Sequence, residues 1–481
     1  MKCVSKINVL TFLFVLGSNC SAQISPKLRT GYNNPLIDHL FTADPTAVEY
    51  EGRLYVYGTN DTEQYENAEK NSYEKIKTLA MISTDDMVNW TYHGTIPVGK
   101  IAPWIINSWA PSVVSRKEED GKTHFYLYFS NSGYGTGVLT ATSPVGPWTS
   151  PLDKSIVDAK TPGLGDCNVP FDPGALIDEN GVGWLAVGAG KSRIARLGKD
   201  MISIDSEFVN PRPQHHFEAN ELNMIGGKYV YTYNIDWQDH SDWKLSDEIP
   251  SKCCMSYMTS ETPLDSMSWK YGNNYLKNAG DFEGFTYTNN HTHLHKYEGK
   301  WYVLYHTEML QDDMNMFDGG FRSMQVAEIN VDEENVHIYP ATVDKQGVSQ
   351  IHPLNPYVWQ QAETVAATEG IKFVESETVG NMIATSGNAF VKHEQPKQSI
   401  MLVRKVDFGK RSKKVMAMLR GNGAVEVRVD SIDSPAVAEL TSASDASGAF
   451  KTVNAKFAVS GVHDLIFILK GEVQFDAWRI K

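Results

Sequence analysis

The chain has 481 residues, a length that favours two domains over a single core. Its hydrophobic content of 41% and charged content of 21% are ordinary for a soluble globular protein. The formal net charge of -14 argues against a nucleic-acid or anionic-membrane surface and is compatible with a neutral ligand.

The first residues have the pattern of an export signal. Two lysines precede an apolar run at residues 7–16, which is too short to span a bilayer, and Ala22 ends a small-residue cleavage site. Cleavage there makes residues 1–22 a signal peptide and the mature protein periplasmic or secreted. The alternative is a surface-anchored lipoprotein acylated at Cys20. Beyond this segment three cysteines remain, an odd number that argues against a disulfide framework: Cys167, Cys253 and Cys254.

A short sequence motif, the repeated phrase, occurs five times between residues 30 and 345. Each copy is a glycine turn followed by aromatic and β-branched residues, the usual signal of a β-hairpin. The copies begin at Gly52, Gly121, Gly181, Gly227 and Gly299. About 60 residues per unit matches a four-stranded blade, so we expect residues 30–345 to form a five-bladed β-propeller. We also expect a short helix within residues 62–76 and an inserted loop within residues 236–281.

One position in each unit stands eight to eleven residues ahead of the glycine. The five residues at this position are Asp44, Ala110, Asp172, Glu218 and His291. Equivalent places in a radial array face a common axis, so the sequence predicts an active site at the centre of the propeller.

Two aspartates and a glutamate are the groups that hydrolysis of a glycosidic bond needs. One carboxylic acid protonates the leaving oxygen, and a second carboxylate activates water or attacks directly. Crowded carboxylates raise the proton affinity of at least one of them, and a glutamate held protonated near neutral pH suits a general acid. The alternative is that the Asp-Pro pairs merely begin turns, but two of them occur here in matched contexts.

Three further residues are candidate substrate ligands. His291 begins a run in which His293 and His295 alternate on one strand face; a zinc site is disfavoured because no fourth ligand is evident. Arg322 could contact a sugar hydroxyl or hold a carboxylate ionised. Trp109 could form a wall for a sugar ring, with core packing as the alternative.

The composition changes near Pro356. No tyrosine follows Tyr357, and short alternating strands with frequent turns take over. This pattern predicts a β-sandwich over residues 358–481.

A series of short words carries these residues: Ala43-Asp44-Pro45, Trp109-Ala-Pro111, Ser143-Pro-Val-Gly-Pro-Trp148, Phe171-Asp172-Pro173, Phe217-Glu218-Ala219, Asn290-His291 and Tyr305-His306. From about residue 34 to 340 the chain thereby resembles glycoside hydrolase family 43, a family of five-bladed propellers that invert the anomeric centre. The resemblance implies that Asp44 is the general base, Asp172 tunes the pKa and orients, and Glu218 is the general acid, with Glu221 as its rival. It further implies a calcium ion in the central channel, held near His291 through water, a substrate contact at Arg322, and no organic cofactor.

The tail resembles a family 6 carbohydrate-binding module in four stretches and in its last strand: Gln361-Ala-Glu363, Val406-Asp-Phe-Gly409, Val425-Glu-Val-Arg-Val-Asp430, Gly461-Val-His-Asp464 and Phe475-Asp-Ala-Trp478. Such modules bind sugars with Tyr and Trp side chains. In this sequence Phe390 and Phe450 occupy about the positions where those aromatic residues are expected. Two interpretations follow: a module that binds sugar, or a domain that packs against the propeller and shapes its funnel.

These features predict an exported inverting glycosidase that acts on plant cell-wall oligo- or polysaccharide. The combination of propeller and module resembles arabinoxylan arabinofuranohydrolases, which favours removal of α-L-arabinofuranosyl side chains from arabinoxylan or arabinan. A β-D-xylosidase with the same residues is the second interpretation. A catalytically silent propeller that only binds sugar is the third.

Overall fold

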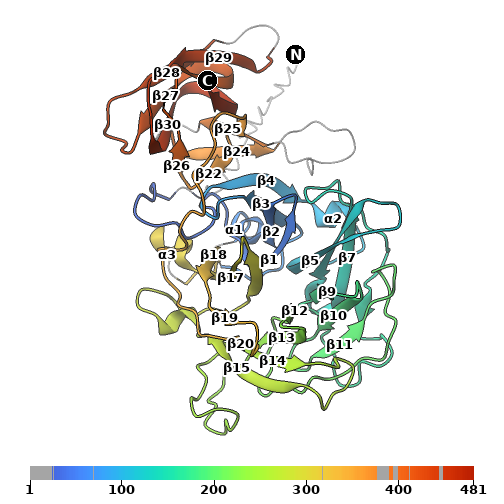
Figure 1. The fold of residues 1–481 in the computed structure, drawn as a ribbon. Coiled ribbons are helices and arrows are strands. Elements are labelled where there is room, and N and C mark those ends of the chain that lie inside the picture. The colour runs from blue at the N-terminus through green and yellow to red at the C-terminus, as the bar shows by residue number, and fades with distance from the viewer. Residues whose placement is uncertain are drawn as a thin grey trace, which may run out of the picture.

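The computed structural model describes Ile24 and residues 26–68, 70–316, 318–375, 389–393, 399–410, 412–443 and 448–481. The expected signal peptide at residues 1–22, with Cys20, lies outside the described residues. The described chain is all-β, a five-bladed propeller followed by a β-sandwich (Figure 1), as the sequence predicts. None of its helices is long and apolar enough to cross a membrane.

Each blade is an antiparallel meander, and the first strands of neighbouring blades contact one another around the axis. Blade one contains β1 (Ala43–Tyr50), β2 (Arg53–Thr59), β3 (Leu79–Thr84) and β4 (Trp90–Ile96). Blade two contains β5 (Trp109–Lys117), β6 (Thr123–Ser130), β7 (Gly135–Ala141) and β8 (Val157–Asp158). Blade three contains β9 (Gly174–Ile177), β10 (Gly183–Val187) and β11 (Arg193–Arg196).

Blade four contains β12 (Glu221–Ile225), β13 (Lys228–Asn234), β14 (Met255–Ser260) and β15 (Lys270–Leu276). Blade five contains β16 (His293–Tyr297), β17 (Lys300–Thr307) and β18 (Ser323–Glu328), and a small hairpin of β19 (Val331–Asp332) and β20 (His337–Ile338) follows it. The inserted loop lies at the start of the expected interval, because it covers residues 235–254 and the blade resumes at β14.

The helices are short. They are α1 (Asp61–Tyr65), α2 (Val98–Ile101) and α3 (Met309–Asp313), with 3-10 turns at Ser132–Tyr134 and Ala279–Asp281. The helix expected within residues 62–76 is therefore only α1, and most of that segment is irregular. Asn71 holds this irregular segment against blade five, because its backbone N–H donates to the Gly319 carbonyl at 2.8 Å.

The propeller core is divided among the gaps between blades. The aromatic and β-branched residues of the repeated phrase alternate between the two faces of each blade, so each gap between neighbours holds its own apolar cluster. The centre is thereby left for polar side chains.

The N-terminal segment closes the ring. Asn34 exchanges hydrogen bonds with Val326 of β18, at 3.1 Å and 3.0 Å, and the Leu36 N–H donates to the Met324 carbonyl at 2.8 Å. The start of the propeller therefore lies along its last blade.

Ten strands, β21 to β30, follow the propeller, and all but β22 belong to the sheet of the sandwich. Their bounds are β21 (Gln360–Gln361), β22 (Thr364–Val365), β23 (Ala367–Glu369), β24 (Ile371–Glu375), β25 (Ala389–His393), β26 (Ser399–Asp407), β27 (Lys414–Val429), β28 (Ala438–Ser442), β29 (Lys451–Lys456) and β30 (Val462–Ile480). The long strands β27 and β30 pair along most of their length, and Trp478 is buried in the apolar core beneath them.

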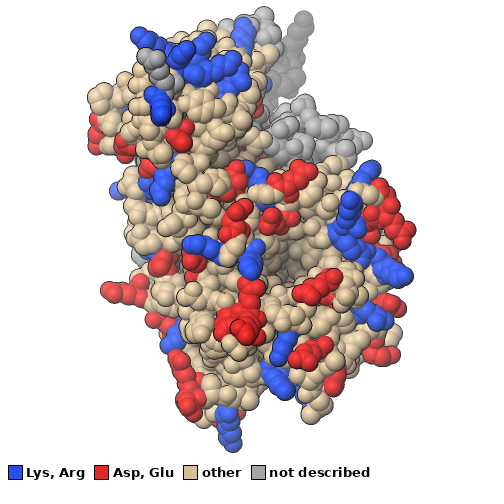
Figure 2. All heavy atoms as spheres, in the orientation of Figure 1, with Lys and Arg blue, Asp and Glu red and all other residues tan. Residues whose placement is uncertain are grey.

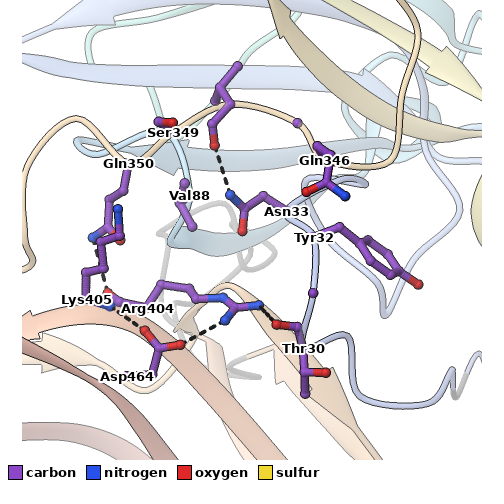
Figure 3. Close-up of a pocket in the computed structure, with 13 residues that line it drawn as sticks. Thr30, Tyr32, Asn33, Val88, Gln346, Ser349, Gln350, Arg404, Lys405 and Asp464 are labelled. Carbon is purple, nitrogen blue, oxygen red and sulfur yellow. Dashed lines mark hydrogen bonds and ion pairs between the residues drawn. The ribbon is translucent and has the colours of Figure 1, made fainter. Parts of the chain in front are cut away.

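The sandwich is joined to blade one. Strand β22 pairs with β4 and so extends the sheet of that blade. Arg29 and Asp38 form an ion pair at 3.3 Å with both side chains 2% exposed, and Asp38 also accepts from the backbone and hydroxyl of Thr368. Figure 3 shows a pocket at this junction, where Arg404 of β26 donates to the carbonyl of Thr30 and pairs with Asp464. Propeller and sandwich are thus linked by buried polar bonds.

Candidate active site

Four first strands begin with the same unusual backbone turn. Asp44, Ala110, Asp172 and Ala219 have φ values of 51°, 40°, 50° and 59°, a left-handed conformation that non-glycine residues rarely adopt. In blade four the residue in this position is therefore Ala219, and Glu218 stands one residue ahead of it. The sequence placed Glu218 in line with the two aspartates, and this alignment is wrong by one residue.

Asp44 is buried and heavily hydrogen-bonded. Its Oδ2 accepts from the Thr59 hydroxyl at 2.6 Å, and its Oδ1 accepts from Arg322 Nη1 at 2.9 Å. Burial alone would raise the pKa of Asp44, but the Arg322 guanidinium, followed by the other surrounding groups, lowers it to about 2. Asp44 is therefore ionised at neutral pH.

Arg322 is held so that one nitrogen remains for Asp44. Its Nε and Nη2 donate to the two oxygens of Asp61 at 2.9 Å and 2.8 Å, a bidentate pair, and Tyr73 lies against the guanidinium at 5.0 Å from its ring centre. Of the two roles that the sequence left open for Arg322, this placement favours holding a carboxylate ionised.

Asp172 has both carboxylate oxygens engaged. Oδ1 accepts from the Ser130 hydroxyl at 3.2 Å, and Oδ2 accepts from the backbone N–H of Ala219 at 3.0 Å. Burial raises its pKa, with the His291 side chain opposing and the Asp44 charge adding to the rise. Asp172 thus fixes the backbone next to Glu218.

Glu218 is the carboxyl group whose proton is retained. Burial first, and then the charges of Asp172 and Asp44, raise its pKa to about 8. Its backbone N–H donates to Asn234 Oδ1 at 2.8 Å, so its main chain is fixed by β13. At neutral pH the site therefore combines an ionised aspartate with a protonated glutamate.

A second ring of polar residues, to which the sequence analysis assigns no role although it quotes Tyr305-His306, supports the first. These residues lie at the ends of second strands: Thr59, Ser130, Asn234 and His306. Three of them accept a backbone N–H from the next blade, namely Thr59 from Ala110 at 2.8 Å, Ser130 from Asp172 at 2.8 Å, and His306 from Asp44 at 3.0 Å. A detectable signal exists, because Thr59, Asn234 and His306 each stand seven residues after the glycine of their phrase.

Blade three interrupts this second ring. Gly188 stands seven residues after Gly181 and offers no side chain, so the N–H of Ala219 donates to Asp172 instead. A Cβ atom at Gly188 would come within 2.1 Å of the Lys191 carbonyl oxygen. Asp172, which precedes the first strand of the same blade, thus supplies the acceptor that the second strand of blade three lacks.

His306 is fixed as a neutral imidazole. Its Nδ1 accepts from the Asp44 N–H, and its Nε2 lies 2.9 Å from the Asn289 carbonyl oxygen, so the proton is on Nε2. Burial lowers its pKa to about 3. His306 therefore orients the Asp44 backbone.

An aromatic pair stands beside the carboxylates. Trp109 is half-buried and donates from Nε1 to the Tyr73 carbonyl at 3.0 Å, and the two rings meet edge to face at 6.1 Å. Sequence reasoning missed Tyr73 because its segment was expected to be helical. The hollow near the middle of the ring is visible in Figure 2, with acidic side chains around it.

His291 is buried between two of the carboxylates. Its Nδ1 lies 3.7 Å from Asp44 and 3.9 Å from Asp172. At the start of β16, the imidazole of His293 contacts the carboxylate of Glu221. Glu221, the alternative general acid, also accepts from the Leu294 N–H. Its carboxylate therefore links blade four to blade five.

The site offers few ligands to a calcium ion. Calcium takes six to eight oxygen ligands, whereas the oxygens of Asp44 and Asp172 already accept from Arg322, Thr59, Ser130 and Ala219. A calcium ion beside His291 fits only with a shell of water, which is the arrangement that the sequence resemblance implies.

Comparisons with known proteins agree with this geometry. The sequence profile of glycosyl hydrolases family 43 matches residues 32–335. An arabinoxylan arabinofuranohydrolase from Bacillus subtilis is 34% identical over 98% of this chain and 99% of its own length. An enzyme of the same name from Paenibacillus polymyxa is 32% identical over 93% of this chain and 74% of its own length.

A solved structure matches the whole fold. The crystal structure of a family 43 arabinoxylan arabinofuranohydrolase from Bacillus subtilis, in complex with cellotetraose, superposes with a TM-score of 0.86 at 32% identity, covering 96% of this chain and 99% of that one. With the propeller, the paired carboxylates and the matching profile together, the chain belongs to glycosyl hydrolases family 43.

Proposed function

We propose that the protein is an inverting glycoside hydrolase that removes α-L-arabinofuranosyl residues from the side chains of arabinoxylan or arabinan. The single observation that carries the mechanism is that two carboxyl groups of the funnel have opposite surroundings. Asp44 Oδ1 accepts from Arg322 at 2.9 Å, which lowers the pKa of Asp44 to about 2, whereas burial and the charge of Asp172 raise the pKa of Glu218 to about 8. The choice of sugar is supported by the two arabinoxylan arabinofuranohydrolases that align with nearly all of this chain.

In this mechanism Asp44 takes a proton from water as the water attacks the anomeric carbon, and Glu218 gives its proton to the leaving oxygen. Arg322 and Thr59 keep Asp44 ionised. Asp172 holds the Ala219 N–H and, by its charge, favours the protonated form of Glu218. In an inverting mechanism the carboxyl groups of Asp44 and Glu218 lie about 6.5–9.5 Å apart, which leaves room for the attacking water molecule.

The substrate would lie against the aromatic pair. We infer that Trp109 forms a wall for the sugar ring, since its indole nitrogen is already fixed by Tyr73. His291, between the two aspartates, is placed to face the sugar from the floor of the funnel.

The test compares wild type with Glu218→Gln on the para-nitrophenyl α-L-arabinofuranoside and β-D-xyloside. We expect faster release from the arabinofuranoside, and at least a hundredfold loss in the variant, the size of effect expected when a general acid is lost. Faster release from the xyloside would establish the second interpretation. Equal inactivity of both proteins, on these substrates and on arabinoxylan, would indicate a propeller that only binds sugar.

We further propose that a calcium ion in the channel is held at His291 through water and adds positive charge beside Asp44 and Asp172. No proton transfer depends on it. Dialysis against a calcium chelator should lower the melting temperature, and added calcium should restore it, because a ligand that binds only the folded state stabilises it. An unchanged melting temperature would remove the ion from the proposal.

We propose that residues 358–481 form a domain related to family 6 carbohydrate-binding modules that serves as a structural partner of the propeller at residues 30–345. The buried junction at Asp38 and Thr368 supports this role. The described groove on the sandwich is lined by Lys372, Val374, Lys392, Arg420, Glu472, Val473, Gln474 and three glycines, and the Phe450 ring lies against the guanidinium of Arg420 at 4.6 Å. The side chain of Phe390 lies outside the described part.

Export is part of the same proposal. A plant polysaccharide is met outside the cell, which agrees with residues 1–22 as a signal peptide, or with Cys20 as a lipid anchor. Mass spectrometry of the mature N-terminus would distinguish cleavage after Ala22 from acylation at Cys20.

A further inference from the structure

Two histidines and an aspartate converge at the base of the inserted loop in blade four. His215 precedes Glu218 by three residues, Asp236 follows β13, and His240 lies one turn further along the loop. One ligand atom from each of the three lies within 4.8 Å of the other two. The backbone brings them together, because the Asp236 N–H donates to the His215 carbonyl at 2.8 Å.

The inner nitrogens of both imidazoles face the same carboxylate. His240 Nε2 lies 2.9 Å from Asp236 Oδ1, and His215 Nδ1 lies 3.7 Å from Asp236 Oδ2. These distances bracket the separation of about 3.4 Å expected between neighbouring ligands of a tetrahedral ion whose bonds are about 2.0–2.1 Å long.

The outer nitrogens of both imidazoles face acceptors as well. His215 Nε2 lies 3.0 Å from Asp242 Oδ1, and His240 Nδ1 lies 3.3 Å from the Pro250 carbonyl oxygen. A histidine that binds a metal almost always donates its other N–H to a carboxylate or a carbonyl, which fixes the tautomer and orients the ring. Both rings here have that second partner.

The nitrogens that face Asp236 are His215 Nδ1 and His240 Nε2, and a lone pair on either of them points at carboxylate oxygens. If each ring keeps its single proton on the outer nitrogen, the inner nitrogens and the Asp236 oxygens are all acceptors, and the Gln238 N–H donates only to Oδ1, at 2.9 Å. A cation bound between the three side chains satisfies these acceptors. The alternative is that His240 carries its proton on Nε2 and donates it to Asp236 Oδ1 at 2.9 Å.

We propose that His215, Asp236 and His240 bind a divalent transition-metal ion such as Zn2+, with Asp242 and the Pro250 carbonyl orienting the two imidazoles. Imidazole nitrogens suit zinc-like ions, whereas calcium prefers oxygen ligands. The two carboxylates of Asp236 and Asp242 balance the charge of the ion. The side chains of His240, His215 and Asp236 are 1%, 20% and 29% exposed. The site is therefore buried on the side of His240 and reached by solvent on the side of the other two residues.

The ion would link the inserted loop to the segment before β12 that carries Glu218. Residues 236–250 leave β13 and return at Cys253, whose N–H donates to the Asp236 carbonyl at 3.0 Å. A metal bond from the loop to His215 would therefore restrain the backbone three residues from the proposed general acid. This site is separate from the calcium position at His291.

The test is isothermal titration of the full, chelator-treated chain with ZnCl2, alongside thermal melting with and without zinc. We expect one saturable zinc ion per chain and a rise in the melting temperature. His215→Ala and Asp236→Asn should each weaken binding by more than a hundredfold and remove the rise, and Asp242→Asn should weaken it about 10–100-fold. CoCl2 should give an absorption band of a low-coordinate site in wild type that is lost in His215→Ala.

Asp120 and His124 supply the matched control. They form an exposed Asp–His pair with the same spacing of four residues, at 3.0 Å, but no second histidine joins them among the described residues. His124→Ala should bind zinc as wild type does. The proposal is overturned if wild type binds no zinc saturably, or if His215→Ala and Asp236→Asn, folded by circular dichroism, bind it as tightly as wild type.

Discussion

The funnel of the propeller and the groove of the sandwich are both polar, but they are built in opposite ways. In the funnel, charged groups are buried and each has a partner, as Arg322 has in Asp44 and Asp61. In the groove, Lys392 and Glu472 are exposed, and Arg420 lies over the Phe450 ring at 4.6 Å. Buried charges are costly unless paired, so they mark where a fold has been arranged around chemistry. The difference favours catalysis in the funnel and a supporting role for the sandwich.

The largest effect should come from removing one charge from the funnel. Asp44→Asn keeps the shape of the side chain but removes the base that activates water, so kcat should fall about 10²–10⁴-fold. The matched change in the sandwich, Asp476→Asn, should leave kcat unchanged. Initial rates on the arabinofuranoside test both variants, and wild-type rates in Asp44→Asn would remove the funnel from catalysis.

The comparison also predicts that the two domains unfold together. Asp38→Ala leaves Arg29 buried without its partner and removes two bonds to Thr368. The free energy of unfolding in urea should fall by about 3–5 kcal/mol. The half-exposed pair of Lys345 and Asp313 is the control, where Asp313→Ala should cost less than about 1 kcal/mol. A separate transition for the sandwich, with little change in Asp38→Ala, would make it an independent module.

A smaller and graded effect is expected from pH. The pKa of Asp44 is about 2, so the base is ionised above that value, and kcat/KM should fall about tenfold per pH unit above pH 8 as Glu218 loses its proton. Burial that raises the pKa of Glu218 above its unfolded value also lowers stability as pH rises from about 4.5 to about 8. Glu218→Gln should lack that decline in urea denaturation midpoints between these pH values. Identical profiles for both proteins would contradict the raised pKa.

Much of the fold is predictable because its signals are local. Glycine turns and alternating aromatic residues repeat at fixed intervals, so the propeller and the positions of Asp44 and Asp172 follow from the amino-acid sequence alone. The alignment of Glu218 does not, because a left-handed residue at Ala219 shifts the strand by one and carries no sequence signature. Residues 62–76 were misjudged for a related reason: their Glu and Lys content suits a helix, whereas contacts with blade five hold the segment open.

The partners of the proposed catalytic residues were predicted least well. Asp61 and Tyr73 lie in the connection between β2 and β3, His306 lies in β17, and only the closed ring brings them to Arg322 and Asp44. Contacts between residues more than 200 positions apart depend on topology, and a single sequence does not reveal them. One signal was available for the second ring, because Thr59, Asn234 and His306 each stand seven residues after the glycine of their repeat.

The missing side chain at Gly188 has a consequence for how the repeat can evolve. A propeller of identical blades would carry the same backbone-binding side chain in every second strand and would have no use for Asp172 as an acceptor. The departure from rotational symmetry in blade three makes Asp172 the acceptor for the Ala219 N–H, next to Glu218. Because Lys191 blocks any larger residue at Gly188, the symmetric arrangement cannot be restored by one substitution. The asymmetry of the ring is therefore itself a condition for its chemistry.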